Sequence, residues 1–178
     1  MAGLKVSPEC LDGARKFLKT VASGPQGEQF AYMPRGGATP CMTAVGLLCS
    51  QHLGAKRDAP QMTAGARYLT EHAPDAQSRN CYYWHYATQA MHNVAGPDWD
   101  NWNRKLRRIL VDTQVKEGCA AGSWDPELPI ADRWGVQGGR VMITSLGALT
   151  LEVYYRYLPL YKLDAEDAWK PAVAPAQL

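Results

Sequence analysis

The sequence predicts an all-α protein made of three helix pairs, in each of which a charged outer helix is followed by an apolar inner helix. Three largely apolar segments begin near residues 39, 81 and 141, and each follows a segment with charged residues. A helix that is apolar or small on nearly every side is buried on nearly every side, whereas a charged face marks a surface helix. The inner helices begin 42 and 60 residues apart, and periods of this size are typical of helical-repeat architectures.

The first outer helix is expected from residue 7 to about residue 22. Ser7 is a suitable N-cap, Pro8 suits the first helical position and Glu9 complements the helix dipole. Apolar side chains recur with helical spacing, which predicts one apolar stripe along the helix. The stripe consists of Cys10, Ala14, Phe17, Leu18 and Val21.

The first inner helix is expected over residues 39–53, with Thr39 as N-cap and Pro40 at the first helical position. Gly54 ends it. The next outer helix covers residues 61–72, where Arg67 and Glu71 form an i,i+4 pair on a surface face.

The second inner helix, residues 80–94, carries no formal charge and is strongly aromatic. Ala95-Gly96-Pro97 break it, and Asp98 is expected to cap an amphipathic outer helix over residues 99–114. The outward charged side chains of that helix are Arg104, Lys105, Arg107, Arg108 and Asp112.

A loop rich in glycine and tryptophan leads to the third inner helix, residues 141–157, which Leu158-Pro159 stop. Glycine lets the backbone turn tightly and tryptophan covers a large apolar area, so we expect an ordered loop. Gln114 is expected to hydrogen-bond the free groups at a neighbouring helix terminus and so tie two helices together. The residues that define the loop motif are Gln114, Gly122, Trp124, Gly138 and Gly139.

Gln114 followed by Gly122-Ser123-Trp124 resembles the glutamine-tryptophan repeat of squalene cyclases and related prenyltransferase-like toroids, the terpenoid cyclase-like family. Residues 138–146 and 151–157 are similar to the last, C-terminal repeats of that family, although residues 116–121 lengthen the gap within the motif. Residues 26–37 resemble a degenerate copy of the motif, with Phe30 in the aromatic role.

The resemblance implies an α/α-toroid, a double-layered ring of roughly five to seven helix pairs. Three pairs make about half of such a ring. The chain is therefore expected to be a half-toroid completed by self-association or by a partner chain, a fragment of a longer protein, or a short open arc.

Residues 1–163 are expected to form a single helical-repeat domain, and residues 164–178 a Pro/Ala-rich tail.

Composition places few limits on the partner. With 46% hydrophobic and 20% charged residues the chain is typical of folded soluble proteins. A net charge of +2 provides no global field for nucleic acid or an anionic membrane, and no window is apolar enough to span a bilayer. Five cysteines without a CxxC pair, and the lack of a signal peptide, favour free thiols and a cytoplasmic location.

Neither catalytic motif of the resembled family is present, so we predict no catalytic residue. Class II terpene cyclases protonate an alkene with an acid of an Asp-x-Asp-Asp motif; the nearest strings here, residues 98–101 and 164–167, lie at a helix start and in the tail. Protein prenyltransferases hold zinc with an Asp-x-Cys motif, which is also absent. Cys81, His85 and His92 share one helical face with Gln89 and are an alternative zinc set, but core or pocket-lining roles are favoured. We expect no metal and no cofactor.

The aromatic inner face is the candidate binding surface. Aromatic rings on inner helices serve either as core or as a lining that stabilises an apolar or cationic ligand. Arg140 could bind an anionic ligand, although fastening the loop through backbone carbonyls is favoured. The candidate pocket residues are Tyr82, His85, Tyr86, Gln89, Trp134, Arg140 and Tyr154.

These observations favour a toroid domain without the catalytic motifs, acting as a binding or assembly module through its aromatic inner face. The expected small-molecule partner is apolar, of isoprenoid type. Two alternatives are a terpenoid cyclase-like enzyme, or half of one, and a zinc-dependent prenyltransferase-like subunit.

Overall fold

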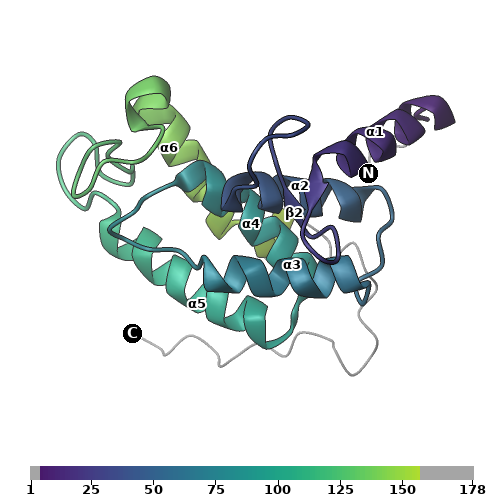
Figure 1. Ribbon diagram of the computed structural model, residues 1–178. Coiled ribbons are helices and arrows are strands. Elements are labelled where there is room, and N and C mark those ends of the chain that lie inside the picture. Colours follow the sequence, from purple (N-terminus) through teal and green to yellow (C-terminus); the bar gives the residue numbers. More distant parts are fainter. Residues whose placement is uncertain (1–4, 157–178) are drawn as a thin grey trace.

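A computed structural model describes residues 5–156 of the chain (Figure 1). Its helices are α1 (Pro8–Val21), α2 (Pro40–His52), α3 (Pro60–Glu71), α4 (Cys81–Val94), α5 (Gly96–Thr113), α6 (Gly135–Leu151) and α7 (Val153–Arg156). A short antiparallel pair of strands, β1 (Ala22–Ser23) and β2 (Gln29–Phe30), joins α1 to α2. The predicted all-α class is therefore confirmed for the described residues.

The three helices predicted as inner helices lie side by side. The central one, α4, packs against α2 on one side and against α6 on the other, while α3 and α5 cover α4 from outside (Figure 1). Polar side chains connect the layers: Gln51 of α2 donates to the carbonyl oxygen of Ala90 in α4 (3.0 Å), and Trp102 of α5 donates to the hydroxyl of Thr88 (3.0 Å). Helices α2 to α5 thus show the predicted alternation, whereas α6 is exposed along one side, with Val141 79% accessible, and is not buried on nearly every side as expected.

The first helix is attached differently from the other outer helices. It contacts α2 and projects away from the body of the protein (Figure 1). Of its predicted apolar stripe only Val21 is buried, Cys10 is exposed, and 52% of Phe17 is accessible to solvent. Only the end of the stripe reaches the core, where Val21 is buried and Leu18 packs against the core as a partly buried side chain.

Local hydrogen bonds explain where the helices begin. The side chains of Ser7 and Thr39 accept from the amides of Cys10 (3.3 Å) and Met42 (3.2 Å), which confirms both predicted N-caps. The predicted cap at Asp98 was wrong. Helix α5 begins at Gly96, three residues before the predicted start at Trp99, after Ala95 with a φ of 58°, and Asp98 lies in its first turn.

The last inner helix also differs from the prediction. Instead of running over residues 141–157, α6 begins at Gly135, kinks at Gly139 (φ 63°) and ends at Leu151, where a turn at Glu152 separates it from α7. A φ of this sign is accessible to glycine at little cost, which explains Gly139. At Gly138 a Cβ atom would collide with the side chain of Met142. The predicted stop at Leu158-Pro159, the residue 163/164 boundary and the 164–178 tail lie outside the described residues.

The long loop between α5 and α6 is held by two buried charged residues that the sequence prediction overlooked. Arg79, only 3% exposed, donates to the carbonyl oxygens of Leu128 (2.7 Å), Ile130 (2.6 Å) and Asp125 (2.9 Å). The carboxylate of Asp132 accepts from the amide of Cys81 (2.8 Å) at the start of α4 and from the amide of Trp134 (2.9 Å) at the start of α6. These bonds satisfy backbone groups that a loop would otherwise leave unpaired.

The two principal motif residues of this loop, Trp124 and Gln114, differ in how far they follow the prediction. The ring of Trp124 is buried, its Nε1 donates to the carbonyl oxygen of Leu110 in α5 (2.8 Å), and its amide donates to the hydroxyl of Thr144 in α6 (3.1 Å). Gln114 was expected to bind the terminus of a neighbouring helix. Instead it donates to the carbonyl oxygen of Gly122 (2.9 Å) and so closes its own loop. The loop is therefore ordered, and Trp124 is the residue that ties α5 to α6.

Candidate ligand-binding groove

Four of the predicted pocket residues form one strip along α4. The rings of Tyr82 and Tyr86 meet edge to face with centroids 4.8 Å apart, and those of His85 and Tyr86 with centroids 5.2 Å apart. The side-chain amide of Gln89 lies 3.0 Å from Nε2 of His85. The structure therefore brings Tyr82, His85, Tyr86 and Gln89 together, as their spacing on one helix predicts.

The electrostatics of this strip favour neutral side chains. A hydrogen bond with Tyr86 and partial burial raise the pKa of Tyr82 to about 12. Burial lowers the pKa of His85 below the ordinary 6.5, and Nδ1 of His85 has no hydrogen-bond partner among the described residues. A neutral, aromatic strip suits an uncharged ligand better than an anionic one.

The other predicted pocket residues lie elsewhere. The guanidinium of Arg140 donates to the hydroxyl of Ser123 (3.0 Å) and to the carboxylate of Asp125, so it fastens the loop, through side chains instead of the expected backbone carbonyls. Trp134 precedes α6, is 41% exposed, and has the Arg133 guanidinium 6.0 Å from its ring centroid. Tyr154 belongs to α7, and its side chain lies outside the described residues.

The alternative zinc set is dispersed. Burial and the nearby Asp132 raise the pKa of the Cys81 thiol, which keeps it protonated, whereas a zinc ligand must be a thiolate. His85 contacts Gln89, and the ring of His92 contacts Trp99 of α5. Within residues 5–156, no group of three or more His, Cys, Asp or Glu side chains is placed to hold a metal ion.

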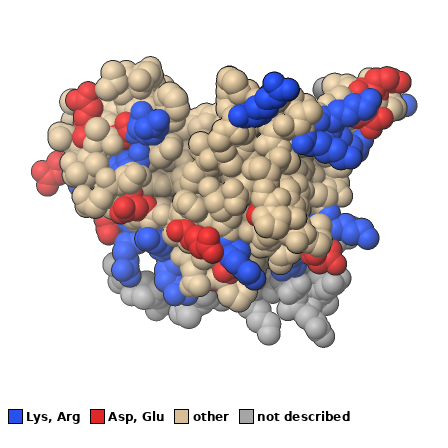
Figure 2. Space-filling view, viewed as in Figure 1, with Lys and Arg blue, Asp and Glu red and all other residues tan. Residues whose placement is uncertain are grey.

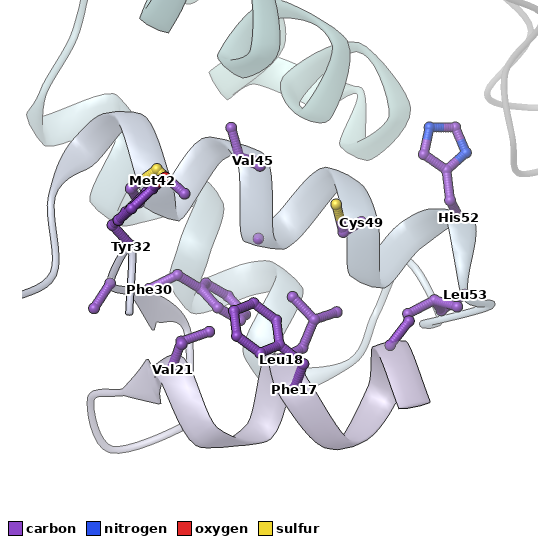
Figure 3. A pocket seen from close by; sticks show the side chains of 13 residues that line it. Phe17, Leu18, Val21, Phe30, Tyr32, Met42, Val45, Cys49, His52 and Leu53 are labelled. Carbon is purple, nitrogen blue, oxygen red and sulfur yellow. The ribbon is translucent and has the colours of Figure 1, made fainter. Parts of the chain in front are cut away.

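A more pronounced binding feature is an apolar groove between α1 and α2, here called the α1–α2 groove (Figure 3). It has a volume of about 370 Å³ and is open to solvent along one side. Helix α1 contributes Ala14, Phe17, Leu18 and Val21, and β2 with its following loop contributes Phe30, Ala31 and Tyr32. Helix α2 contributes Met42, Val45, Gly46, Cys49 and His52, and Leu53 follows.

The groove exists because α1 does not lie flat on α2. Phe17, Leu18 and Val21 come from α1 and face α2, and Phe30 lies between the two helices (Figure 3). Phe30 is almost fully buried against Gly46, where a Cβ atom would collide with its ring. The aromatic floor is thus fixed, while the wall formed by α1 remains partly exposed.

Few polar groups face the groove. Partial burial raises the pKa of the solvent-accessible Cys49 thiol, so most of this thiol is protonated at neutral pH. His52 points away from α1 at the end of α2 (Figure 3). Among the described side chains that line the groove, none carries a carboxylate. The arrangement can hold an apolar molecule, but it offers no acid with which to protonate one.

The α4 strip adjoins one end of the groove. Tyr32 lines the groove, and Cys41 precedes the groove residue Met42 on α2. Both Tyr32 and Cys41 act electrostatically on Tyr82, raising its pKa further, which places them near the start of the strip. The strip therefore begins near the Tyr32 end of the groove.

The sequence contained the components of the groove but not its opening. The sequence predicted an apolar stripe on α1 and a buried inner helix at α2. The groove residues among them are Ala14, Phe17, Leu18, Val21, Met42, Val45 and Cys49. The spacing shows which residues share a face, whereas the angle between α1 and α2 decides whether that face is covered. The exposed fraction of Phe17 is the signal that only the structure supplies.

Comparison of the chain with protein-family models, with curated proteins and with solved structures finds no match. None of the helices within residues 5–156 combines the length and the apolar composition needed to cross a bilayer.

Proposed function

We propose that this protein is a non-catalytic binding module that holds an elongated, uncharged apolar molecule of isoprenoid type in the α1–α2 groove. The observation that carries this proposal is the groove itself, with about 370 Å³ lined by apolar side chains between two helices. Ligand pockets in proteins commonly measure about 300 to 1,000 Å³ and are mostly apolar with few polar groups. The adjoining Tyr82 and Tyr86 supply hydroxyl groups for a weakly polar end of the ligand.

Binding is favoured over catalysis by the chemistry of the lining. Protonation of an alkene requires a desolvated acid that is held protonated beside the substrate. Among the described side chains that line the groove there is no Asp or Glu that could serve as such an acid. The resemblance to terpenoid cyclase-like toroids supports the choice of an isoprenoid chain as ligand, because that family handles such chains.

The test is a titration of the protein with an isoprenoid alcohol such as farnesol. Binding is measured by the displacement of a fluorescent apolar probe. Val45 lines the groove, so Val45→Trp fills it and is expected to weaken binding by at least tenfold. The matched control is Val111→Trp at an exposed position of α5, which is expected to leave affinity unchanged. Equal affinities in both variants, or no binding by the parent protein, would refute the groove as the site. If Gln89→Trp abolished binding while Val45→Trp did not, the binding site would be the α4 strip and not the groove.

Assembly is a second candidate function, favoured by a separate observation at the opposite edge of the inner layer. Val136 and Val141 of α6 are 80% and 79% exposed, and Trp134 just before α6 is 41% exposed. Exposed apolar side chains of this kind mark surfaces that associate with another chain. Self-association, or a partner chain, would then complete a ring.

Light scattering over a range of protein concentrations tests the assembly role. We expect a mass above 19.6 kDa that falls toward it on dilution, and a Val136→Ser, Val141→Ser double variant that is monomeric at the same concentrations. A parent protein that is monomeric throughout would exclude self-association through this edge.

A further inference from the structure

Helix α1 has an exposed side in addition to the side that meets α2. Val21 is buried and Leu18 packs against the core, so these residues mark the side that faces α2. Four residues on another side of the helix are all exposed and recur at i, i+3, i+7 and i+10: Cys10, Gly13, Phe17 and Thr20. This spacing is that of the seam between two paired helices, and the four residues are here called the α1 seam.

The α1 seam is open to a partner. Phe17 is 52% exposed, and Val6, just before the helix, is 54% exposed. A Cβ atom added at Gly13 would have nothing within 4 Å, so the middle of the seam is bare backbone that a second helix can approach closely. Because α1 projects away from the body of the protein, no other described element covers this side (Figure 1).

The charges along α1 are separated by sign. Its first turns carry Glu9 and Asp12, its last turns carry Lys16 and Lys19, and Arg15 between them is paired with Asp12 (2.9 Å). Figure 2 shows acidic side chains toward the projecting end of α1 and basic ones nearer the body. When two such helices pair antiparallel, the acidic half of each lies against the basic half of the other.

Glu9 and Lys16 flank the seam on the side away from α2. If Cys10 and Phe17 take position a of a heptad, Glu9 and Lys16 take position g, where charged residues set the orientation of paired helices. They are seven residues apart, about 10 Å along the helix, so they do not pair with each other. In an antiparallel pair the g positions of the two helices face each other, so Glu9 of each copy meets Lys16 of the other. The same register sets Phe17 against Val6 of the second copy.

The remaining cations of this segment do not oppose the pairing. Lys19 takes position c of the same heptad and points away from the seam, and Lys5 precedes the helix. A parallel arrangement would instead set acid against acid and bring the two bodies side by side. Charge therefore favours the antiparallel arrangement, in which the two bodies lie at opposite ends of the helix pair.

We propose that α1 is a self-association surface, on which α1 of a second copy packs antiparallel across a two-fold axis. Such an interface uses the same patch on both copies, so the contact between Glu9 and Lys16 occurs twice. Phe17 also lines the α1–α2 groove, and the second copy covers the exposed part of its ring. This pairing goes beyond ligand binding, and it uses other residues than the association through the α6 edge.

Sedimentation equilibrium of the full-length protein tests the pairing. One helix pair is a small interface, so we expect weak association, at protein concentrations above those used to test the α6 edge. The Val136→Ser, Val141→Ser background removes that edge from the result. Glu9→Lys replaces two ion pairs with two like-charge contacts and should weaken association about tenfold, and Lys16→Glu should do the same.

Mixing the two single variants separates pairing from any other role of these residues. A Glu9→Lys chain and a Lys16→Glu chain complement each other at both contacts, so the mixture should associate about as tightly as the parent, although neither variant does so alone. The matched control is Lys19→Glu, the same charge change away from the seam, which should leave association unchanged.

A parent that stays monomeric at the highest concentration contradicts the pairing. So does a mixture that does not associate, or a loss in Lys19→Glu equal to that in Lys16→Glu. Farnesol binding by the monomer reports on the ligand-binding proposal separately.

Discussion

Phe30 and Trp124 occupy equivalent positions in two copies of one structural unit. The amide of Phe30 donates to the hydroxyl of Thr43 in α2, and the amide of Trp124 donates to the hydroxyl of Thr144 in α6, each at 3.1 Å. Each ring then lies against the glycine three residues further along the helix, Gly46 or Gly147. This pairing supports the interpretation of residues 26–37 as a degenerate copy of the later motif.

The two glycines should respond differently to alanine. A Cβ at Gly46 would overlap the ring of Phe30, whereas a Cβ at Gly147 would lie 3.1 Å from Cε3 of Trp124. Overpacking of this kind typically costs about 1 to 3 kcal/mol, so we expect Gly46→Ala near the upper end and Gly147→Ala near the lower. Urea unfolding measures both. The control is Gly13→Ala on α1, which has nothing within 4 Å and should be neutral or slightly stabilising.

Removing the guanidinium of Arg79 should loosen the loop between α5 and α6. The guanidinium donates to three backbone carbonyl oxygens of the loop, those of Asp125, Leu128 and Ile130. A buried carbonyl that loses its hydrogen-bond donor costs about 1 to 3 kcal/mol. We expect Arg79→Met to lower the free energy of unfolding by about 3 kcal/mol. Hydrogen exchange of residues 115–134 should accelerate by more than that of α2. Unchanged exchange in the loop would show that Arg79 does not hold it.

Stability should fall as the pH decreases below about 6.5. Burial lowers the pKa of His85 and of His92 in the folded state, so between the folded and unfolded values the unfolded chain binds more protons. The stabilisation is complete above the unfolded pKa and is lost as the pH falls toward the folded one. Each unit of depression corresponds to about 1.4 kcal/mol.

Chemical unfolding at pH 7.5 and at pH 5 is the measurement for this pH dependence. The slope of unfolding free energy against pH should become smaller in His85→Gln. The same change at the exposed His52 is the control and should leave the slope as it is. A slope that His85→Gln does not alter would assign the pH dependence to other groups.

Arg140 should matter for the loop and not for the ligand. Its partners are Ser123 and Asp125, and the amides of Glu127 and Leu128, followed by Arg140, hold the pKa of Asp125 below its usual value. Arg140→Gln is expected to cost about 1 kcal/mol, as for a partly exposed pair, and to change farnesol affinity by less than twofold. A large loss of affinity with intact stability would return Arg140 to the binding site.

The helix pattern could be predicted from the sequence because each helix carries its own start and its own apolar periodicity. Ser7 and Thr39 cap as expected, and uncharged stretches became the inner helices α2 and α4. Gly139 was recognised as part of the motif, but the kink it permits depends on backbone conformation, so the start of α6 was placed too late.

The site was harder to predict than the helices. Tyr82, His85, Tyr86 and Gln89 share a face by spacing alone, and this set was found. Arg79 and Asp132 act on backbone groups about fifty positions away, which no local pattern encodes. The groove depends on the angle of α1 to α2, and a stripe that is left open has the same sequence as a stripe that is covered.

The measurement that tests the groove most directly is the rate at which a thiol reagent alkylates Cys49 with and without bound farnesol. Cys49 lines the groove and is exposed, while Cys10 and Cys119 are exposed outside it and serve as internal controls. At a ligand concentration ten times the dissociation constant, mass action predicts about tenfold slower alkylation of Cys49 and unchanged rates at Cys10 and Cys119. Bound farnesol that leaves the Cys49 rate unchanged, or slows all three thiols equally, would contradict a ligand in the α1–α2 groove.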